Sequence, residues 1–228
     1  IVLFGFKGMD ENDDASVQTV FSQSKRIHNK EAFIALLILC GGYLLAWIGY
    51  VQWQSTIAAY TQTLGVSLKM YSLLWTVNGL FIVLGQPIVN LFLKKWLHST
   101  TSQILVGYCI FVVSFVIVGN AKDFNGFMIA MVVLTIGEML VWPGVPSIAA
   151  ELAPPGRAGF YQGVVNSTAT GGRMLGPLFG GMVADLFNIS VLFQTIIGLM
   201  VISFILTVVY SRNRHSIKQQ DASQQVSI

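Results

Sequence analysis

Two residues of opposite charge stand inside apolar stretches of this 228-residue chain. Glu138 lies in the stretch LTIGEMLVWPGVP, and Arg173 lies in the apolar stretch that begins at residue 158. A carboxyl group in such surroundings can bind and release a proton, because burial disfavours its charged form while a nearby guanidinium favours it. The two residues therefore indicate either a proton-binding site or a structural ion pair in which each charge neutralises the other.

The elements that must position these residues are membrane-spanning helices. Hydrophobic residues make up 54% of the chain and charged residues only 10%, against about 25% in soluble domains. Apolar segments of roughly 20 residues or more are long enough to cross a hydrocarbon core of about 30 Å as helices. We place six of them, at residues 32–60, 70–93, 102–120, 124–150, 158–186 and 189–210. The sequence thus predicts an all-α integral membrane protein.

The remaining segments are assigned by their polarity. Residues 1–6, IVLFGF, are typical of the end of a preceding transmembrane helix, which indicates a fragment of a longer protein. Residues 7–31 form a polar, charged linker, residues 32–210 form the six-helix domain, and residues 211–228 form a polar tail. We expect both the linker and the tail to be cytoplasmic.

The distribution of basic residues gives this orientation. With the linker inside, only Lys69 and Lys122 fall outside, and ten basic residues fall inside. The ten are Lys7, Lys25, Arg26, Lys30, Lys94, Lys95, Arg157, Arg212, Arg214 and Lys218. Because basic residues favour the cytoplasmic side of a membrane, this bias predicts a cytoplasmic C-terminus. We expect a multi-pass protein of the plasma membrane.

Counting from the inner turn APPGRAG predicts that Glu138 and Arg173 lie at the same depth. Glu138 is 16 residues before Pro154, and Arg173 is 16 residues after Arg157. In regular helices both would lie about 24 Å from the turn. A charge at the bilayer centre costs about 2.5–3.5 kcal/mol, so such residues usually face a bundle interior or a watery cavity.

Polar and aromatic residues at helical spacing accompany the two charges. Gln162, Asn166 and Thr170 share one helix face with Arg173. Further members on other segments are Trp47, Tyr50, Gln54, Asn78, Gln86, Thr135 and Trp142. Each could instead form a hydrogen bond between helices, worth about 0.6 kcal/mol. As a convergent set they favour a cavity that binds a small-molecule substrate, with Arg173 either tuning the proton site or contacting the substrate.

Small residues and prolines indicate where helices pack closely and bend. Gly172, Gly176 and Gly180 are four residues apart and predict a smooth face for a neighbouring helix. Pro177 would loosen the hydrogen-bond ladder of the same helix, and Pro143 would bend the preceding one.

The sequence predicts no cofactor, no metal and no nucleic-acid partner. Cys40 and Cys109 lie in apolar segments without metal-ligand spacing, and no phosphate-binding or dinucleotide-binding motif is present. No nucleophile–base pair is recognisable, which excludes an obvious enzyme.

Several segments resemble the C-terminal half of a major facilitator superfamily transporter. The stretch GEMLVWPGVPSIAAEL resembles the tenth helix of that family, and the stretch APPGRAGFYQGVVNSTATGGRMLGPLFGG resembles the following turn and the eleventh helix. The first two segments, with NGLFIVLGQP, resemble the seventh and eighth helices. The resemblance implies half of a twelve-helix fold, built as a 3+3 inverted repeat, with an N-terminal six-helix half as its missing partner.

The glycine spacing of the fifth segment also resembles a family motif. Gly163, Gly172, Gly176–Pro177 and Gly180–Gly181 match the pattern G-x8-G-x3-GP-x2-GG, the antiporter motif of the family's fifth helix. The loop NLFLKKWLHST does not match the family's first-half loop, so we assign the chain to the second half, where this motif leaves the direction of transport open.

The fourth segment is similar to proton-coupled exporters of the drug:H⁺ antiporter group. This resemblance implies that Glu138 takes part in proton coupling and that the protein exports drugs or other amphipathic compounds by alternating access. Arg173 departs from the small or apolar residue usual there, and would also suit an anionic substrate. The alternatives are an uptake symporter for a sugar, peptide or organic anion, and a truncated membrane protein that transports nothing.

Overall fold

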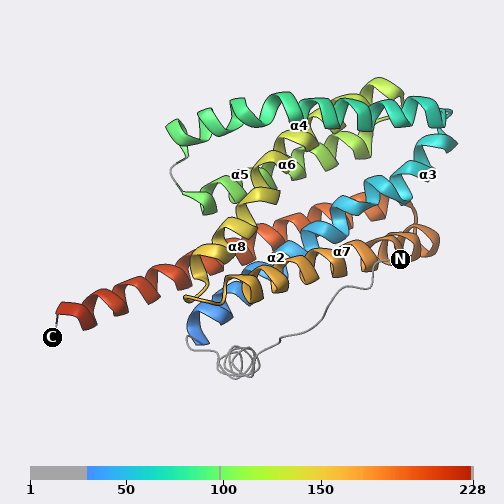
Figure 1. Ribbon diagram of the computed structural model, residues 1–228. Coiled ribbons are helices and arrows are strands. Elements are labelled where there is room, and N and C mark those ends of the chain that lie inside the picture. The colour runs from blue at the N-terminus through green and yellow to red at the C-terminus, as the bar shows by residue number, and fades with distance from the viewer. Residues whose placement is uncertain (1–29, 98, 227–228) are drawn as a thin grey trace, which may run out of the picture.

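The computed structural model describes residues 30–97 and 99–226, and they form a bundle of long helices (Figure 1). The elements are α2 (Lys30–Tyr50), the 3-10 helix η1 (Val51–Gln54), α3 (Thr56–Thr63), α4 (Leu68–Trp96), α5 (Thr100–Asn120), α6 (Phe124–Leu152), α7 (Ala158–Leu186) and α8 (Ile189–Val226). The all-α prediction is confirmed. The predicted preceding helix, and the linker up to residue 29 with Lys7, Lys25 and Arg26, lie outside the described residues, whereas Lys30 and Glu31, predicted in the linker, begin α2.

Within residues 30–97 and 99–226, five helical segments are long and apolar enough to cross a membrane. They are Lys30–Thr63, Leu68–Val89, Thr100–Asn120, Phe124–Leu152 and Ile189–Asn213. Helix α7 has 29 residues, the same length as α4 and α6, but its glycines and polar residues make it less apolar. Together with α7 these segments give the six predicted helices, and the bounds of α7 are the predicted ones.

Two elements differ from the sequence prediction. The first apolar segment is broken by η1 into α2 and α3, and α8 continues to Val226, beyond the predicted end at residue 210. Both differences have the same reason: hydropathy reports which residues prefer lipid, whereas helix ends and breaks depend on backbone hydrogen bonds.

Side-chain hydrogen bonds stabilise the break between α2 and α3. The Ser55 hydroxyl donates to the Val51 carbonyl at 3.2 Å, and the Thr56 hydroxyl donates to Gln52 Oε1 at 3.0 Å. Such bonds compete with regular helical geometry and bend helices. Gln52 is fully buried, and its Nε2 donates to the carbonyls of Ile48 at 2.9 Å and Gly176 at 2.7 Å. The break is therefore attached to α7.

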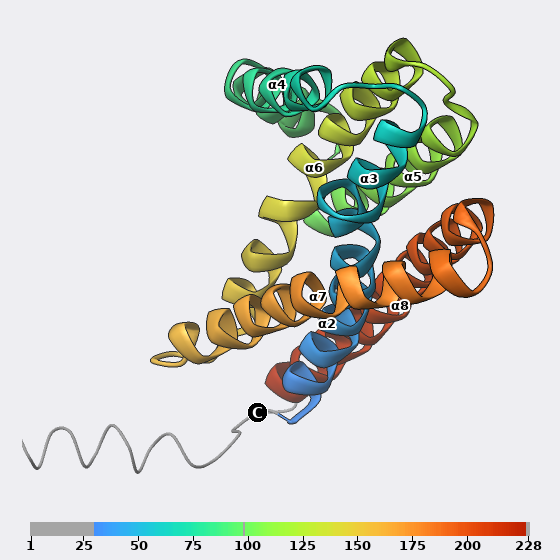
Figure 2. The ribbon, with the colours of Figure 1, turned by 90° about the vertical axis from the view of Figure 1, so that its right-hand side faces the viewer.

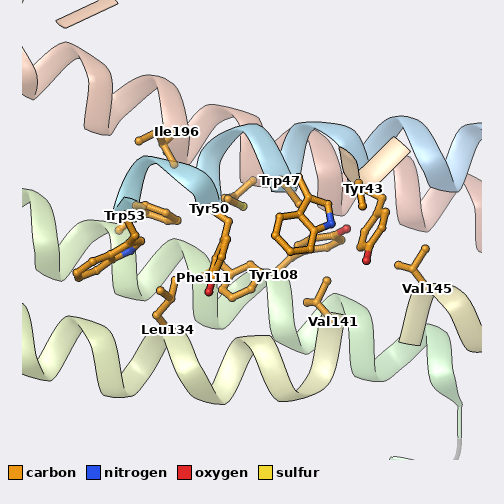
Figure 3. Close-up of a cluster of buried hydrophobic side chains, with 14 of the residues drawn as sticks. Tyr43, Trp47, Tyr50, Trp53, Tyr108, Phe111, Leu134, Val141, Val145 and Ile196 are labelled. Atoms are coloured by element: carbon orange, nitrogen blue, oxygen red, sulfur yellow. The ribbon is translucent and has the colours of Figure 1, made fainter. Parts of the chain in front are cut away.

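The helices pack around an aromatic core. Helix α5 packs along α6, α2 along α8, and α7 against α2 and α6, while α4 contacts mainly α6 (Figures 1 and 2). The largest buried side chains include Trp53, Tyr108, Phe111, Phe115 and Phe127. The rings labelled in Figure 3 form a row between α2 with η1 and the neighbouring helices α5 and α6, and they are Tyr43, Trp47, Tyr50, Trp53, Tyr108 and Phe111.

Helices α4 and α7 keep many large apolar side chains exposed. On α4, Val83 is 71% exposed and Leu91 70%, and on α7 Met174 is 72% exposed and Leu178 64%. These surfaces would be covered by lipid or by another protein segment, because exposed apolar patches of this extent are unusual in water.

Glycines bring α7 close to α2. A Cβ atom at Gly172 would lie 2.5 Å from Trp47 Cβ and 2.9 Å from the Leu44 carbonyl oxygen. A Cβ atom at Gly176 would overlap Val51, and one at Gly180 would overlap the Gln52 side chain. Helix α7 therefore lies too close to α2 and η1 for any larger residue at these positions.

This packing predicts that Gly176→Leu destabilises the protein by about 1–3 kcal/mol, the usual cost of overfilling a packed interior. Thermal unfolding of the full-length protein in detergent would measure the change as a lower Tm. Gly198→Leu is the matched control, since Gly198 is also inside a helix but has open space around its Cβ position. Equal losses in the two variants would contradict a packing role for Gly176.

Candidate functional site

Glu138 lies inside the bundle on α6 and is only 4% exposed. Asn78 of α4 donates from Nδ2 to Glu138 Oε1 at 3.0 Å and to the Thr135 hydroxyl at 2.9 Å. Thr135 donates in turn to the Met131 carbonyl at 2.7 Å. The carboxyl group is thus reached by a hydrogen-bond network that joins α4 to α6.

Tyr50 provides a second partner for the carboxyl group. Its hydroxyl donates a hydrogen bond to Glu138, and its ring stands at the end of α2. Three helices therefore meet at one carboxyl group. Its hydrogen-bond partners within residues 30–97 and 99–226 are neutral side chains, so no basic residue there neutralises the charge directly.

Four rings form what we call the aromatic box, namely Tyr43, Trp47 and Tyr50 of α2 and Trp142 of α6. Trp47 and Trp142 are stacked, with centroids 4.1 Å apart and planes 13° apart. Tyr43 and Tyr50 stand edge-on to both indoles, at centroid distances of 5.1–6.1 Å. Spacings of four and three residues place the α2 rings on one helix face, where they lie in a row toward α5 and α6 (Figure 3).

Arg173 lies against the aromatic box and makes no ion pair with Glu138 in the described part of the chain. Its guanidinium carbon is 4.0 Å from the centroid of the Trp47 ring. Because Trp142 stacks on one face of Trp47 at almost the same distance, the guanidinium must cover the opposite face. The alternative in which the two charges neutralise each other directly therefore does not describe this structure.

The other polar residues predicted for the cavity have different surroundings. Gln162 donates to the Pro146 carbonyl at 2.7 Å and so links α7 to α6, in which both Pro143 and Pro146 lie. Asn166 and Thr170 are exposed on α7. Gln86 donates to the Met139 carbonyl at 3.4 Å. Asn78, Tyr50, Trp47 and Trp142 are thus gathered around Glu138 and Arg173, whereas Gln162 forms a contact between helices.

Sequence reasoning missed Gln52, which is buried at the break in the first segment. The signal was present as two glutamines and adjacent Ser55 and Thr56 in the stretch VQWQST, directly after a long apolar run. Cys40 is a buried free thiol beside an open groove of about 600 Å³ between α2 and α7, whose lining includes Leu44, Phe160, Gly163 and Thr168.

Metal chemistry has no candidate in this region. No group of three or more His, Cys, Asp and Glu residues that could hold an ion occurs among residues 30–97 and 99–226. The site consists of a buried acid, neutral hydrogen-bond donors, an aromatic box and one guanidinium. These groups can bind a proton and an amphipathic molecule.

Comparisons with known proteins agree with this description. Residues 39–226 match the model of the Major Facilitator Superfamily. The chain is 51% identical over 227 residues to the uncharacterized MFS-type transporter YttB of Bacillus subtilis. The alignment covers 100% of this chain and 57% of YttB. The chain is 28% identical over 177 residues to the uncharacterized MFS-type transporter YqjV of the same organism, covering 73% and 42%.

A more distant relative carries a functional name. The multidrug resistance protein MdtG of Proteus mirabilis is 26% identical over 194 residues, covering 82% of this chain and 47% of MdtG. The chain spans about half the length of the curated relatives it matches. Since the family match extends over most of the chain, the chain belongs to the Major Facilitator Superfamily.

Proposed function

We propose that the full-length protein is a proton-coupled exporter of small amphipathic compounds, in which Glu138 binds the coupled proton. The observation that carries this proposal is a buried carboxyl group whose partners, Asn78 and Tyr50, are neutral. An ionised carboxylate accepts hydrogen bonds from both, and a protonated one can itself donate. Because no fixed cation among the described residues stabilises the charged form, the carboxyl group can exist in both protonation states. A proton carrier requires this.

Tyr50 connects the proton site to the aromatic box. Its hydroxyl bonds to Glu138, and its ring packs edge-on against Trp47 and Trp142. A compound that binds against the indoles would move this ring and so change the stability of the charged carboxyl group. Proton and substrate would then each alter the affinity for the other, which is the reciprocal coupling that exchange transport needs.

Flexible points in the helices support an alternating-access mechanism. Helix α6 contains Pro143 and Pro146, α7 contains Pro177, and the first span is broken at η1. We infer that this half rocks against an N-terminal six-helix half, whose contact surface includes the exposed apolar faces of α4 and α7. The excess of basic residues on one side supports a cytoplasmic C-terminus, and we place the protein in the plasma membrane.

The direction of transport is supported by four relatives named multidrug resistance protein, which are 24–27% identical to this chain. Uptake of a sugar, peptide or organic anion is the competing function. An assay in proteoliposomes with the pH gradient in either orientation separates them, since an exporter moves substrate against the proton flow and a symporter moves it with the flow.

Glu138→Gln removes the titrating group but keeps hydrogen-bonding capacity and size. We expect gradient-driven export of a fluorescent amphipathic probe by the full-length protein to fall at least tenfold, while equilibrium binding of the probe remains within about threefold. The physical reason is that a neutral amide cannot carry a proton. Proteoliposomes with an imposed pH gradient provide the measurement.

Asp185→Asn is the matched control, because Asp185 is an exposed acid near the end of α7. This variant should export like the wild type. Unchanged gradient-driven export by Glu138→Gln would remove the proposed coupling role.

Tyr50→Phe keeps the ring in the aromatic box and removes the hydroxyl that bonds to Glu138. A hydrogen bond to a charged group is worth about 1.5–3 kcal/mol. We therefore expect export to slow by roughly tenfold or more, with a change in probe affinity of less than about twofold. Rates and affinities measured on the same preparations test this, and Tyr60→Phe, on α3, is the control. Parallel losses of affinity and rate would show that Tyr50 contributes to binding instead of coupling.

A further inference from the structure

The position of Arg173 on Trp47 has a consequence for the substrate. One face of the Trp47 indole is covered by Trp142, at 4.1 Å, and the other by the Arg173 guanidinium, at 4.0 Å. Trp47 itself is 92% buried. The face of an aromatic ring carries negative electrostatic potential, so the position above it favours a cation. In this structure the protein's own side chain fills that position.

The guanidinium is held there by a weak interaction. Arg173 is exposed, and its described contact is the ring of Trp47, without a carboxylate partner among the described residues. An exposed cation–π contact favours the position of the guanidinium on the ring by a factor of only about two to five in the equilibrium constant. Thr170 and Asn166 lie on the same face of α7, three and seven residues before Arg173, and are exposed as well. The side chain can therefore leave the ring and extend along a polar surface.

We propose that Arg173 is a resident cation in a binding site for organic cations, and that a substrate with a delocalised positive charge displaces it from Trp47. This inference rests on the proposed function and adds the charge class of the substrate. Such a molecule would stack on the face of Trp47 that Arg173 covers in this structure, near Tyr43 and Tyr50. Arg173 then sets specificity by competing with the substrate. In the opposite arrangement, Arg173 would bind an anionic substrate directly.

The test uses two probes of nearly the same size and shape but opposite charge, tetraphenylphosphonium and tetraphenylborate. Equilibrium binding to the full-length protein in detergent is measured by isothermal titration calorimetry, without a pH gradient. Arg173→Gln should bind the phosphonium about two- to fivefold more tightly than the wild type, because the competing cation has been removed. Binding of the borate should not weaken.

Arg173→Lys separates the charge from the planar group. Lysine keeps the positive charge but stacks less well on an aromatic face, so its affinity for the phosphonium should lie between those of the wild type and Arg173→Gln. Lys122→Gln, which removes an exposed basic residue from the loop before α6, should bind both probes like the wild type. Thermal unfolding of every variant verifies that its fold is intact, and Arg173→Lys provides the comparison if the glutamine variant is unstable.

Three results would overturn the inference. Weaker phosphonium binding by Arg173→Gln, or loss of borate binding, would make Arg173 a direct substrate contact. Equal phosphonium binding by wild type and variants would make it a bystander. The absence of phosphonium binding to every variant would mean that the ring face is not a cation site. These experiments measure binding without a pH gradient, whereas Glu138→Gln tests proton-coupled export. Either proposal can therefore be contradicted while the other stands.

Discussion

A carboxyl group inside a membrane bundle must find its hydrogen-bond donors within the protein, because the hydrocarbon core supplies none. Glu138 finds them on two other helices, in Asn78 of α4 and Tyr50 of α2. This requirement couples the positions of three helices, since moving any one of them would leave a buried polar group without a partner. The same requirement brings the rings of α2 against Trp142, only four residues beyond Glu138 on α6.

Close packing of α7 on α2 determines the position of Arg173. Gly172 lies directly against Trp47, so the helix axis comes close enough for the neighbouring Arg173 to lie over the indole. Gln52 of η1, directly after α2, strengthens the same contact, because it donates to the carbonyl of Gly176 just before Pro177. Small residues in membrane helices thus determine how near the functional side chains come to one another.

The helices themselves could be predicted because lipid imposes long apolar runs, and the limits of α7 agree with the sequence. The break at Gln52 could not, since one buried glutamine hardly changes the average hydropathy of a long segment. For the site, counting residues relates Glu138 and Arg173 by depth but says nothing of how each helix is rotated. Rotation depends on packing against neighbours. It leaves Arg173 stacked on Trp47, while Glu138 bonds to Asn78 and Tyr50.

The separation of the two charges also bears on how a charged substrate could enter an apolar protein interior. Bringing an extra cation next to the aromatic box would add an uncompensated charge, which is costly where the dielectric constant is low. If the substrate instead replaces the guanidinium of Arg173 on the same ring, the number of charges against the box is unchanged, and Arg173 remains on the exposed face of α7. An exchange of one cation for another thus avoids most of the electrostatic cost of binding. The protonation state of Glu138 then determines when this exchange of cations is favourable.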